Sequence, residues 1–285
     1  LNFVIFYIEK NFYWQEGYYL HDKNDLKKNI IKYIICLLSL YLYGFYKNGI
    51  LLYSKDYVSF LEMFKIVYLL ILSICAYFLT NKILKKEFKL DLTFLSSFLI
   101  PLFMPLSINL FVYFGIVFIF LLFRKYYNAA LVILVLSFLG KFAGPMDDTS
   151  LYAFGTWDYL WGRNIGGIGS TSIVLGIIIA IVLSFTNNYK YLISIFGILS
   201  FSILSILFKD YAFLINGNAI LTILFIATIP DKSPVLKKYM IIYGLLIGIL
   251  GSIFMKVLNP YYGMVLSTAV ISIIYEILLV KKFNI

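Results

Sequence analysis

The segment with the clearest chemical potential is a glycine-rich stretch, residues 162–172 (GRNIGGIGSTS). Gly166, Gly167 and Gly169 predict a flexible turn, and the hydroxyl residues after them can cap the helix expected to follow. A glycine-rich loop that leads into a helix N-terminus offers free N–H groups and a positive dipole end to an anion. Aromatic side chains between residues 152 and 161 could supply flat faces, so the pattern suits a phosphorylated aromatic cofactor. The residues that we predict to bind it here are Arg163, Gly166, Gly167, Gly169, Ser170, Thr171 and Ser172.

A structural interpretation of the same stretch is at least as strong. Aromatic side chains at a membrane interface form an ordinary anchoring belt. Glycines also let helices pack closely. Without further information, the residue types alone favour this second interpretation.

Other chemistry is scarce in this chain. His21 is the single histidine, so a haem held by two histidines or a histidine-rich metal site is excluded. Cys36 and Cys75 lie in apolar runs and are expected to pack there. Glu276 is the carboxylate nearest the middle of an apolar run, and we expect it to pair with Lys281 or Lys282 near the helix end.

Composition defines the class of protein. Of the 285 residues, 62% are hydrophobic and only 13% are charged, whereas soluble domains carry about 25% charged residues. Soluble enzymes, disulfide scaffolds and disordered chains are therefore excluded. The sequence predicts an all-α integral membrane protein with about ten transmembrane helices, each needing roughly 20 apolar residues.

Ten apolar runs follow an aromatic and charged N-terminal segment, residues 1–28. We expect a first set of five helices in residues 29–143, an outer loop in residues 144–170, and a second set of five in residues 171–285. The runs cover residues 29–46, 64–80, 92–107, 109–123, 129–143, 171–185, 191–208, 213–229, 239–256 and 262–280. Pro101 and Pro105 mark where one span should turn into the next between residues 92 and 123. Asn216 and Asn218 could face a cavity or cap a broken helix, and we expect the cap.

The basic residues predict the orientation. The net charge is +10, and with the N-terminus inside, 17 of the 24 lysines and arginines fall on the inner side and 7 on the outer side. Cytoplasmic loops normally carry the excess of positive charge. We therefore expect a multi-pass protein of the cell (inner, cytoplasmic) membrane with both termini cytoplasmic.

The two halves of the chain share a weak sequence similarity. Residues 98–105 (FLIPLFMP) resemble residues 224–230 (LFIATIP), and each stretch precedes a helix with an aromatic–glycine pair. Because five spans per half would invert the second half, the pattern predicts two inverted five-helix repeats. Repeats of this kind with proline-broken helices are common in transporters and channels.

Several motifs together resemble the NqrB/RnfD family, the membrane subunits of sodium-pumping quinone reductases and Rnf electron-transport complexes. Residues 162–172 are similar to the family's glycine-rich segment that ends in Gly-Glu-Thr-Ser. Residues 91–102 (DLTFLSSFLIPL), 128–131 (NAAL), 227–234 (ATIPDKSP) and 241–250 (IIYGLLIGIL) resemble further family motifs in the same order. The resemblance covers about residues 91–280.

The resemblance implies two inverted five-helix repeats and an FMN joined to a threonine on the outer side. The matching stretch begins at Asp148, with Thr149 and Ser150 following, but the acceptor position holds Phe154, or Ala153 in a shifted alignment. We add Asp148, Thr149 and Ser150 to the predicted cofactor-binding residues. Because the acceptor threonine is missing, we expect FMN to be held noncovalently or to be absent.

The resulting prediction is a membrane subunit of an Rnf/Nqr-like complex that helps to move electrons coupled to ion translocation. Its expected partners are other Rnf/Nqr-like membrane and flavin subunits and the lipid bilayer, without nucleic acid. The chain has no Gly-x-Gly-x-x-Gly loop, so we do not expect it to use NADH unaided. The alternative is a channel, transporter or non-redox scaffold on the same fold that has lost flavin.

Overall fold

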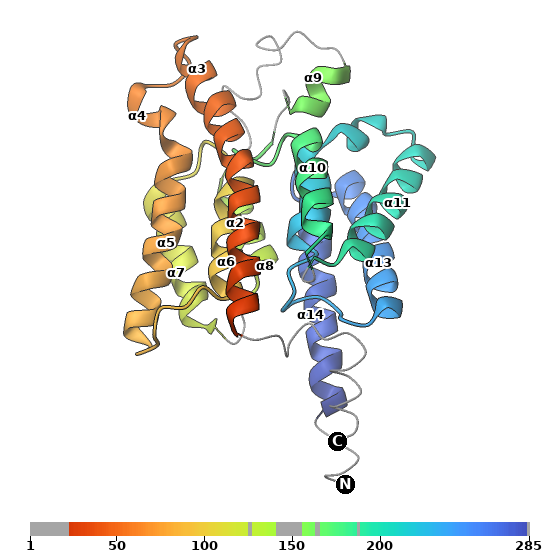
Figure 1. Ribbon diagram of the computed structural model, residues 1–285. Helices are drawn as coiled ribbons and strands as arrows, with labels where there is room; N and C mark the ends of the chain where they lie inside the picture. Colours follow the sequence, from red (N-terminus) through yellow and green to blue (C-terminus); the bar gives the residue numbers. More distant parts are fainter. Residues whose placement is uncertain (1–22, 125–126, 141–155, 163–165, 187–188, 284–285) are drawn as a thin grey trace.

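A computed structural model of the chain describes residues 23–124, 127–140, 156–162, 166–186 and 189–283 (Figure 1). In these residues all regular structure is helical, which confirms the predicted all-α class. Of the predicted site residues, Asp148, Thr149, Ser150 and Arg163 lie outside the described residues, as do residues 1–22 of the N-terminal segment.

The helices of the first half run up and down the bundle in turn (Figure 1). α2 (Lys23–Phe45) continues through a π-helical turn, η1 (Tyr46–Ile50), into the short helix α3 (Leu51–Tyr53). The elements after α3 are α4 (Phe60–Met63), α5 (Lys65–Ile83), α6 (Leu92–Leu99), the 3-10 helix η2 (Ile100–Phe103), α7 (Leu110–Leu122) and α8 (Ala129–Leu139).

The second half repeats this alternation. It comprises α9 (Thr156–Trp161), α10 (Ile173–Ser184), α11 (Tyr191–Leu207), η6 (Tyr211–Ile215), α12 (Gly217–Leu221), the π-helical turn η7 (Thr222–Ile226), α13 (Lys237–Val257) and α14 (Gly263–Phe283). The beginning of α2 and the end of α14 lie on the same side of the bundle, at the bottom of Figure 1.

The described helices suit a membrane. By length and composition, three of them can cross one: Lys27–Tyr53, Lys65–Ile83 and Lys237–Val257. The shorter apolar helices are Leu92–Phe103, Leu110–Leu122, Ala129–Leu139, Ile173–Ser184, Tyr191–Leu207, Gly217–Ile226 and Gly263–Leu278. Every predicted apolar run overlaps one of these helices, and large apolar side chains such as Phe111 and Phe185 are exposed. The chain is a membrane-embedded protein, while its grouping into inverted repeats stays a prediction.

Side-chain caps begin many of these helices. Since lipid offers no hydrogen bonds, backbone N–H groups at a helix start must be satisfied within the protein. Asp91, Asn109, Asn128, Ser172 and Asn216 each accept a hydrogen bond from a backbone N–H in the first turn. Ser172 and Asn216 confirm two caps that the sequence predicts.

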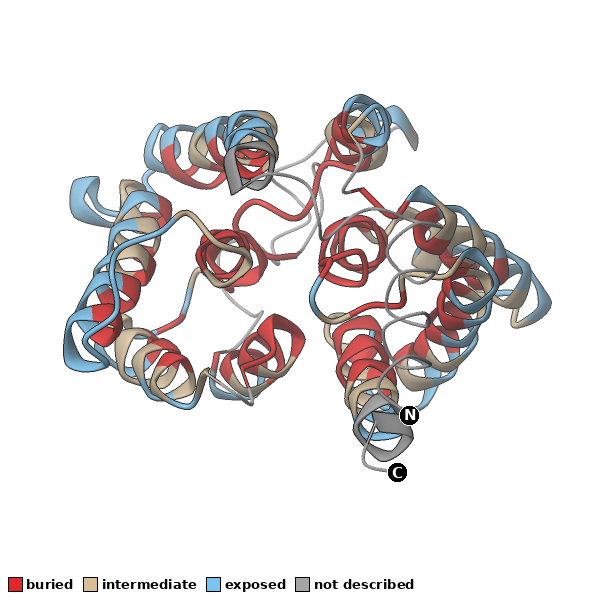
Figure 2. Ribbon diagram, turned by 60° about the horizontal axis from the view of Figure 1, so that its bottom comes forward, coloured by how far each residue is buried: buried red, intermediate tan, exposed pale blue. Residues whose placement is uncertain are grey.

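Two helices stop inside the bundle instead of crossing it as continuous α-helices. α6 tightens into η2 around Pro101 and ends at an extended Met104, and the chain becomes helical again at Leu110. α12 changes into the π-helical η7 and ends before Pro230. Both broken helices are almost wholly buried, in line with the buried interior that Figure 2 shows. The proline-marked turn between residues 92 and 123 is therefore confirmed.

Small residues bring α11 and α13 into close contact. Gly244 and Gly248 on α13 are four residues apart, the spacing that lets helices approach closely in membranes. A Cβ at Gly248 would lie 2.4 Å from the carbonyl oxygen of Gly197 on α11. Backbone contact of this kind holds the second half together where apolar burial from water gives no driving force.

Candidate functional site

The glycine-rich segment forms the centre of the molecule. Residues 166–172 are all buried, have no regular secondary structure and lead into α10. The Ile168 amide donates to the carbonyl of Met104, and the Gly169 amide donates to that of Leu102, each at 2.8 Å. The segment thus pairs with the end of the broken helix α6–η2. We call residues 166–172 the central segment.

Close backbone approach explains two of the glycines here. A Cβ at Gly167 would lie 2.8 Å from the carbonyl oxygen of Leu102 and 2.8 Å from the carbonyl carbon of Phe103. A Cβ at Gly217, the first residue of α12, would lie 2.1 Å from the carbonyl oxygen of Thr171. The central segment therefore touches both broken helices, and glycine is needed where it does so.

Side-chain hydrogen bonds fasten the same contacts. The Ser170 hydroxyl donates to Asn218 Oδ1 at 2.7 Å, and Asn218 Nδ2 donates to the carbonyl of Tyr261 at 2.5 Å. Asn216 Nδ2 donates to the carbonyl of Pro260 at 2.9 Å. The central segment, the start of α12 and the turn before α14 are thereby joined by one polar network.

A buried lysine reaches the central segment from the first helix. Lys47 is 2% exposed, and its Nζ donates to Thr171 Oγ1 at 3.1 Å. Its neighbour Asn48 donates from Nδ2 to the carbonyl of Ile168 at 2.5 Å, while Asn48 Oδ1 is buried with no hydrogen-bond partner among the described residues. Both residues belong to the π-helical turn η1, and such turns often occur at functional sites.

An ionisable side chain at membrane depth points to a functional site by default. The charge count of the sequence places Lys47 on the outer side, but that count does not indicate that the side chain is buried. Residues 46–50 continue the helix, so Lys47 stays inside the protein. A lysine followed by Asn48 and Gly49 directly after an apolar run was the available signal, and it is a weak one.

The predicted binding residues are thus partly brought together. Gly166, Gly167, Gly169, Ser170, Thr171 and Ser172 lie in the central segment. Two of its amides and the Ser170 hydroxyl already bond within the protein. Within the described residues, the segment is closed packing and does not form an open cradle for a phosphate.

Exposed aromatic side chains lie on α9, the helix before the central segment in the chain. α9 packs against α10. Trp157 and Trp161 are 72% and 46% exposed and stand one helical turn apart on α9. These two indole rings are available to a ligand, a partner protein or the membrane interface.

Comparison with known families identifies the chain. The family model of NQR2, RnfD, RnfE matches residues 127–278, more than half of the sequence. The chain belongs to this family. A comparison with curated proteins finds no match. The match begins just before α8 and ends within α14, so it includes the central segment, α12 and the turn that follows η7.

Membership confirms the resemblance predicted from the motifs. The family consists of membrane subunits of Rnf/Nqr-type complexes, so the chain is expected in a multi-subunit assembly. The first-half motif at residues 91–102 lies outside the match but forms the other broken helix.

Two further ion pairs join distant parts of the chain. Arg124 forms an ion pair with Asp91 and donates to Asn81 Oδ1 at 3.0 Å. Glu276 pairs with Lys232 in the turn after η7. The fold thus brings a lysine 44 residues earlier in the chain beside Glu276, while the side chains of the expected partners Lys281 and Lys282 lie outside the described part of the structure.

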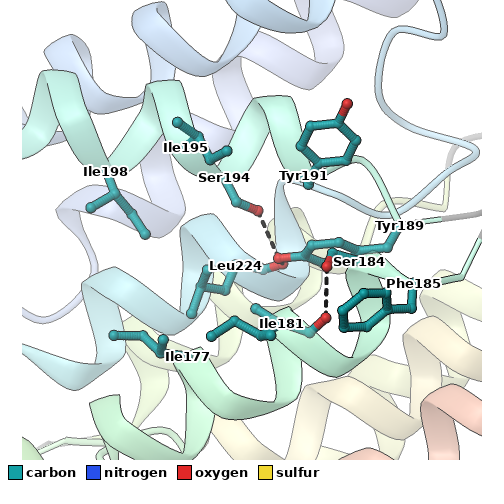
Figure 3. A pocket seen from close by; sticks show the side chains of 11 residues that line it. Ile177, Ile181, Ser184, Phe185, Tyr189, Tyr191, Ser194, Ile195, Ile198 and Leu224 are labelled. Carbon is teal, nitrogen blue, oxygen red and sulfur yellow. Dashed lines mark hydrogen bonds between the residues drawn. The ribbon is translucent and has the colours of Figure 1, made fainter.

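A groove of about 520 Å³ lies between α10 and α11 (Figure 3). Its polar centre is the Tyr189 hydroxyl, which hydrogen-bonds with Ser194 Oγ at 2.7 Å and donates to the carbonyl of Leu224 at 3.2 Å. Most of its other lining side chains are isoleucine and further apolar types that lipid-facing helices commonly present. We assign no ligand to it.

Proposed function

We propose that the chain is a membrane subunit of an Rnf/Nqr-type electron-transport complex in the cell membrane. In this proposal the beginning of α2 and the end of α14 both face the cytoplasm. Family membership across α8 to α14 is the observation that carries this proposal. Electrons would pass through partner subunits and cofactors, and this chain would place them relative to the membrane.

A flavin site is the finer part of the proposal. The described central segment does not fit a phosphate, since its Ile168 and Gly169 amides are bonded to Leu102 and Met104. We therefore propose that any FMN lies on the outer side of the segment, near the predicted residues Asp148–Ser150 and Arg163. Trp157 and Trp161 support this position, because exposed indole rings can stack on a flat ring system.

An open pore through the centre is the weaker alternative. The backbone contact of Thr171 with Gly217 and the two hydrogen bonds to η2 and Met104 fill the place where a central pathway would run. This packing favours a positioning subunit over a channel.

The decisive test is the visible absorption spectrum of the purified chain in detergent, after co-expression with a flavin transferase and again after acid precipitation. We expect the purified protein to show a flavin spectrum, and we expect acid precipitation to release this flavin to the supernatant. Flavin that stays in the pellet would mean covalent attachment at a hydroxyl. A colourless protein would overturn the flavin proposal and favour a scaffold or transporter.

A matched pair of variants separates the site from general surface effects. Trp157→Ala together with Trp161→Ala should lower the flavin content several-fold. Tyr211→Ala removes another exposed aromatic ring, at the start of η6, without changing α9, and should leave the flavin content unchanged. Equal flavin loss in both proteins would contradict a site at α9.

A further inference from the structure

A second buried lysine sits at the opposite end of the broken helix α12–η7. Lys190 directly precedes α11 and is 3% exposed. Its Nζ donates to the carbonyl of Pro230 at 2.9 Å, to the carbonyl of Ser233 at 2.7 Å and to Ser233 Oγ at 2.9 Å. A buried ammonium group thus has three oxygen atoms from one short turn around it.

The orientation of these oxygens is fixed by the fold. The Ser233 hydroxyl donates its proton to the carbonyl of Ile229 at 2.7 Å, so its lone pairs are free to face Lys190. The turn of residues 230–233 follows the C-terminal end of η7, where helix carbonyls concentrate negative potential. Asp231 in the same turn interacts electrostatically with Lys190.

This geometry is that of a cation site. In broken-helix membrane proteins, unwound carbonyls and the C-terminal ends of half-helices coordinate small cations. Here the cation is the side-chain ammonium group of Lys190. The carbonyls of Pro230 and Ser233 and the Asp231 carboxylate favour the ammonium here, and they offset its position at the positive N-terminal end of α11.

We propose that the three oxygens of Pro230 and Ser233 form a monovalent cation site that the Lys190 ammonium permanently fills. We call these three oxygens the oxygen cage. With Lys190 in place, the inner end of α12–η7 takes up no exchangeable cation. Without the side chain, the cage accepts a small cation that donates hydrogen bonds, such as ammonium or methylammonium. The inference does not depend on flavin binding.

The test compares the wild-type chain with Lys190→Ala by thermal unfolding of the purified full chain in detergent. Methylammonium, which reproduces the tip of the lysine side chain, is added in a concentration series. Ammonium and sodium are run in parallel, and choline chloride keeps the ionic strength constant without offering an N–H donor. Lys238→Ala, which removes an exposed lysine near the start of α13, is the matched control.

In choline, we expect Lys190→Ala to unfold roughly 5–10 °C below the wild type, because charge-assisted hydrogen bonds are lost. Methylammonium or ammonium should restore at least half of this difference along a saturating curve. The wild type and Lys238→Ala should shift by less than about 1 °C under the same exchange.

A Tm of Lys190→Ala that is equal in all four salts would overturn the proposal and leave Lys190 as a simple tether. A wild type that responds as strongly as the variant would overturn it too. If Lys190→Ala yields no folded protein in choline, it is extracted in methylammonium instead. Recovery of monodisperse protein only in methylammonium supports the cage, and no recovery in either salt overturns it. These unfolding measurements do not depend on whether the protein binds flavin, so the Lys190 proposal and the flavin proposal can fail separately.

Discussion

Replacing Gly217 with alanine tests whether the central segment truly touches α12 through backbone. The added Cβ would lie 2.1 Å from the carbonyl oxygen, 2.5 Å from the carbonyl carbon and 2.7 Å from the Cα of Thr171. All three are backbone or Cα atoms, so no side chain can rotate away. Ordinary contact begins at 3.4 Å, so the two backbones must separate by more than an ångström.

That separation has a calculable cost. Overpacking a buried contact costs about 1–3 kcal/mol. Moving the central segment also weakens the hydrogen bonds of Ile168 and Gly169, at about 1 kcal/mol for a typical bond. We therefore expect a net loss of roughly 2–4 kcal/mol, which lowers Tm by about 5–15 °C in a chain of this size.

The assay is thermal unfolding of the detergent-purified protein, followed by circular dichroism at the helix band. Gly115→Ala is the matched control, because Gly115 lies within α7 and a Cβ there has no atom within 4 Å. Alanine at that position gains about 0.5–1 kcal/mol of helix stability. The reasoning is refuted if the two variants unfold within about 1 °C of each other.

Three further predictions use the same unfolding measurement. Gly248→Leu should separate α11 from α13 and lower Tm by at least about 5 °C, and an unchanged Tm would contradict the close packing. Glu276→Gln breaks the partly buried pair with Lys232 and should cost about 1 kcal/mol or more, whereas Glu87→Gln removes an exposed pair and should cost almost nothing. Hydrogen bonds from the backbone and side chain of the helix cap hold the pKa of Glu62 below its usual value. Its stabilisation is therefore present above the usual pKa and lost as the pH falls through the lowered one, so the Tm difference between wild type and Glu62→Gln should shrink in acid.

Local signals in the sequence predict most of the helical framework. The ten apolar runs each overlap a helix, because the length and hydrophobicity of a span are local properties. Ser172 and Asn216 cap the helices that they precede, and the chain turns near Pro101 as predicted. Each of these features depends on a few neighbouring residues.

The polar interior could not be predicted in the same way. Lys47 and Thr171 are 124 residues apart, and Lys190 and Ser233 are 43 apart. Only the crossing of the broken helices brings them together, and single charges in a sequence carry no sign of such pairing. The charge count therefore placed Lys47 on the outer side and Lys190 on the inner side without indicating that the fold buries both side chains.

The role of Ser170 can be decided by a double-mutant cycle with Asn218. Both side chains are buried, and the Ser170 hydroxyl donates to Asn218 Oδ1 at 2.7 Å. If the main role of Ser170 is to form this hydrogen bond, the effects of Ser170→Ala and Asn218→Ala on the free energy of unfolding should couple by about 1 kcal/mol. Ser73, which bonds to Tyr113 in a separate network, should give additive effects with Asn218.

The two single variants should destabilise the protein to different extents. Asn218→Ala leaves both the Ser170 hydroxyl and the carbonyl of Tyr261 without their partner, so it should destabilise the protein more than Ser170→Ala. A coupling near zero would mean that Ser170 is not committed to Asn218 and is available to a ligand, as the sequence predicts. A coupling near 1 kcal/mol would assign Ser170 to the packing of the central segment and move the search for a flavin entirely to its outer side.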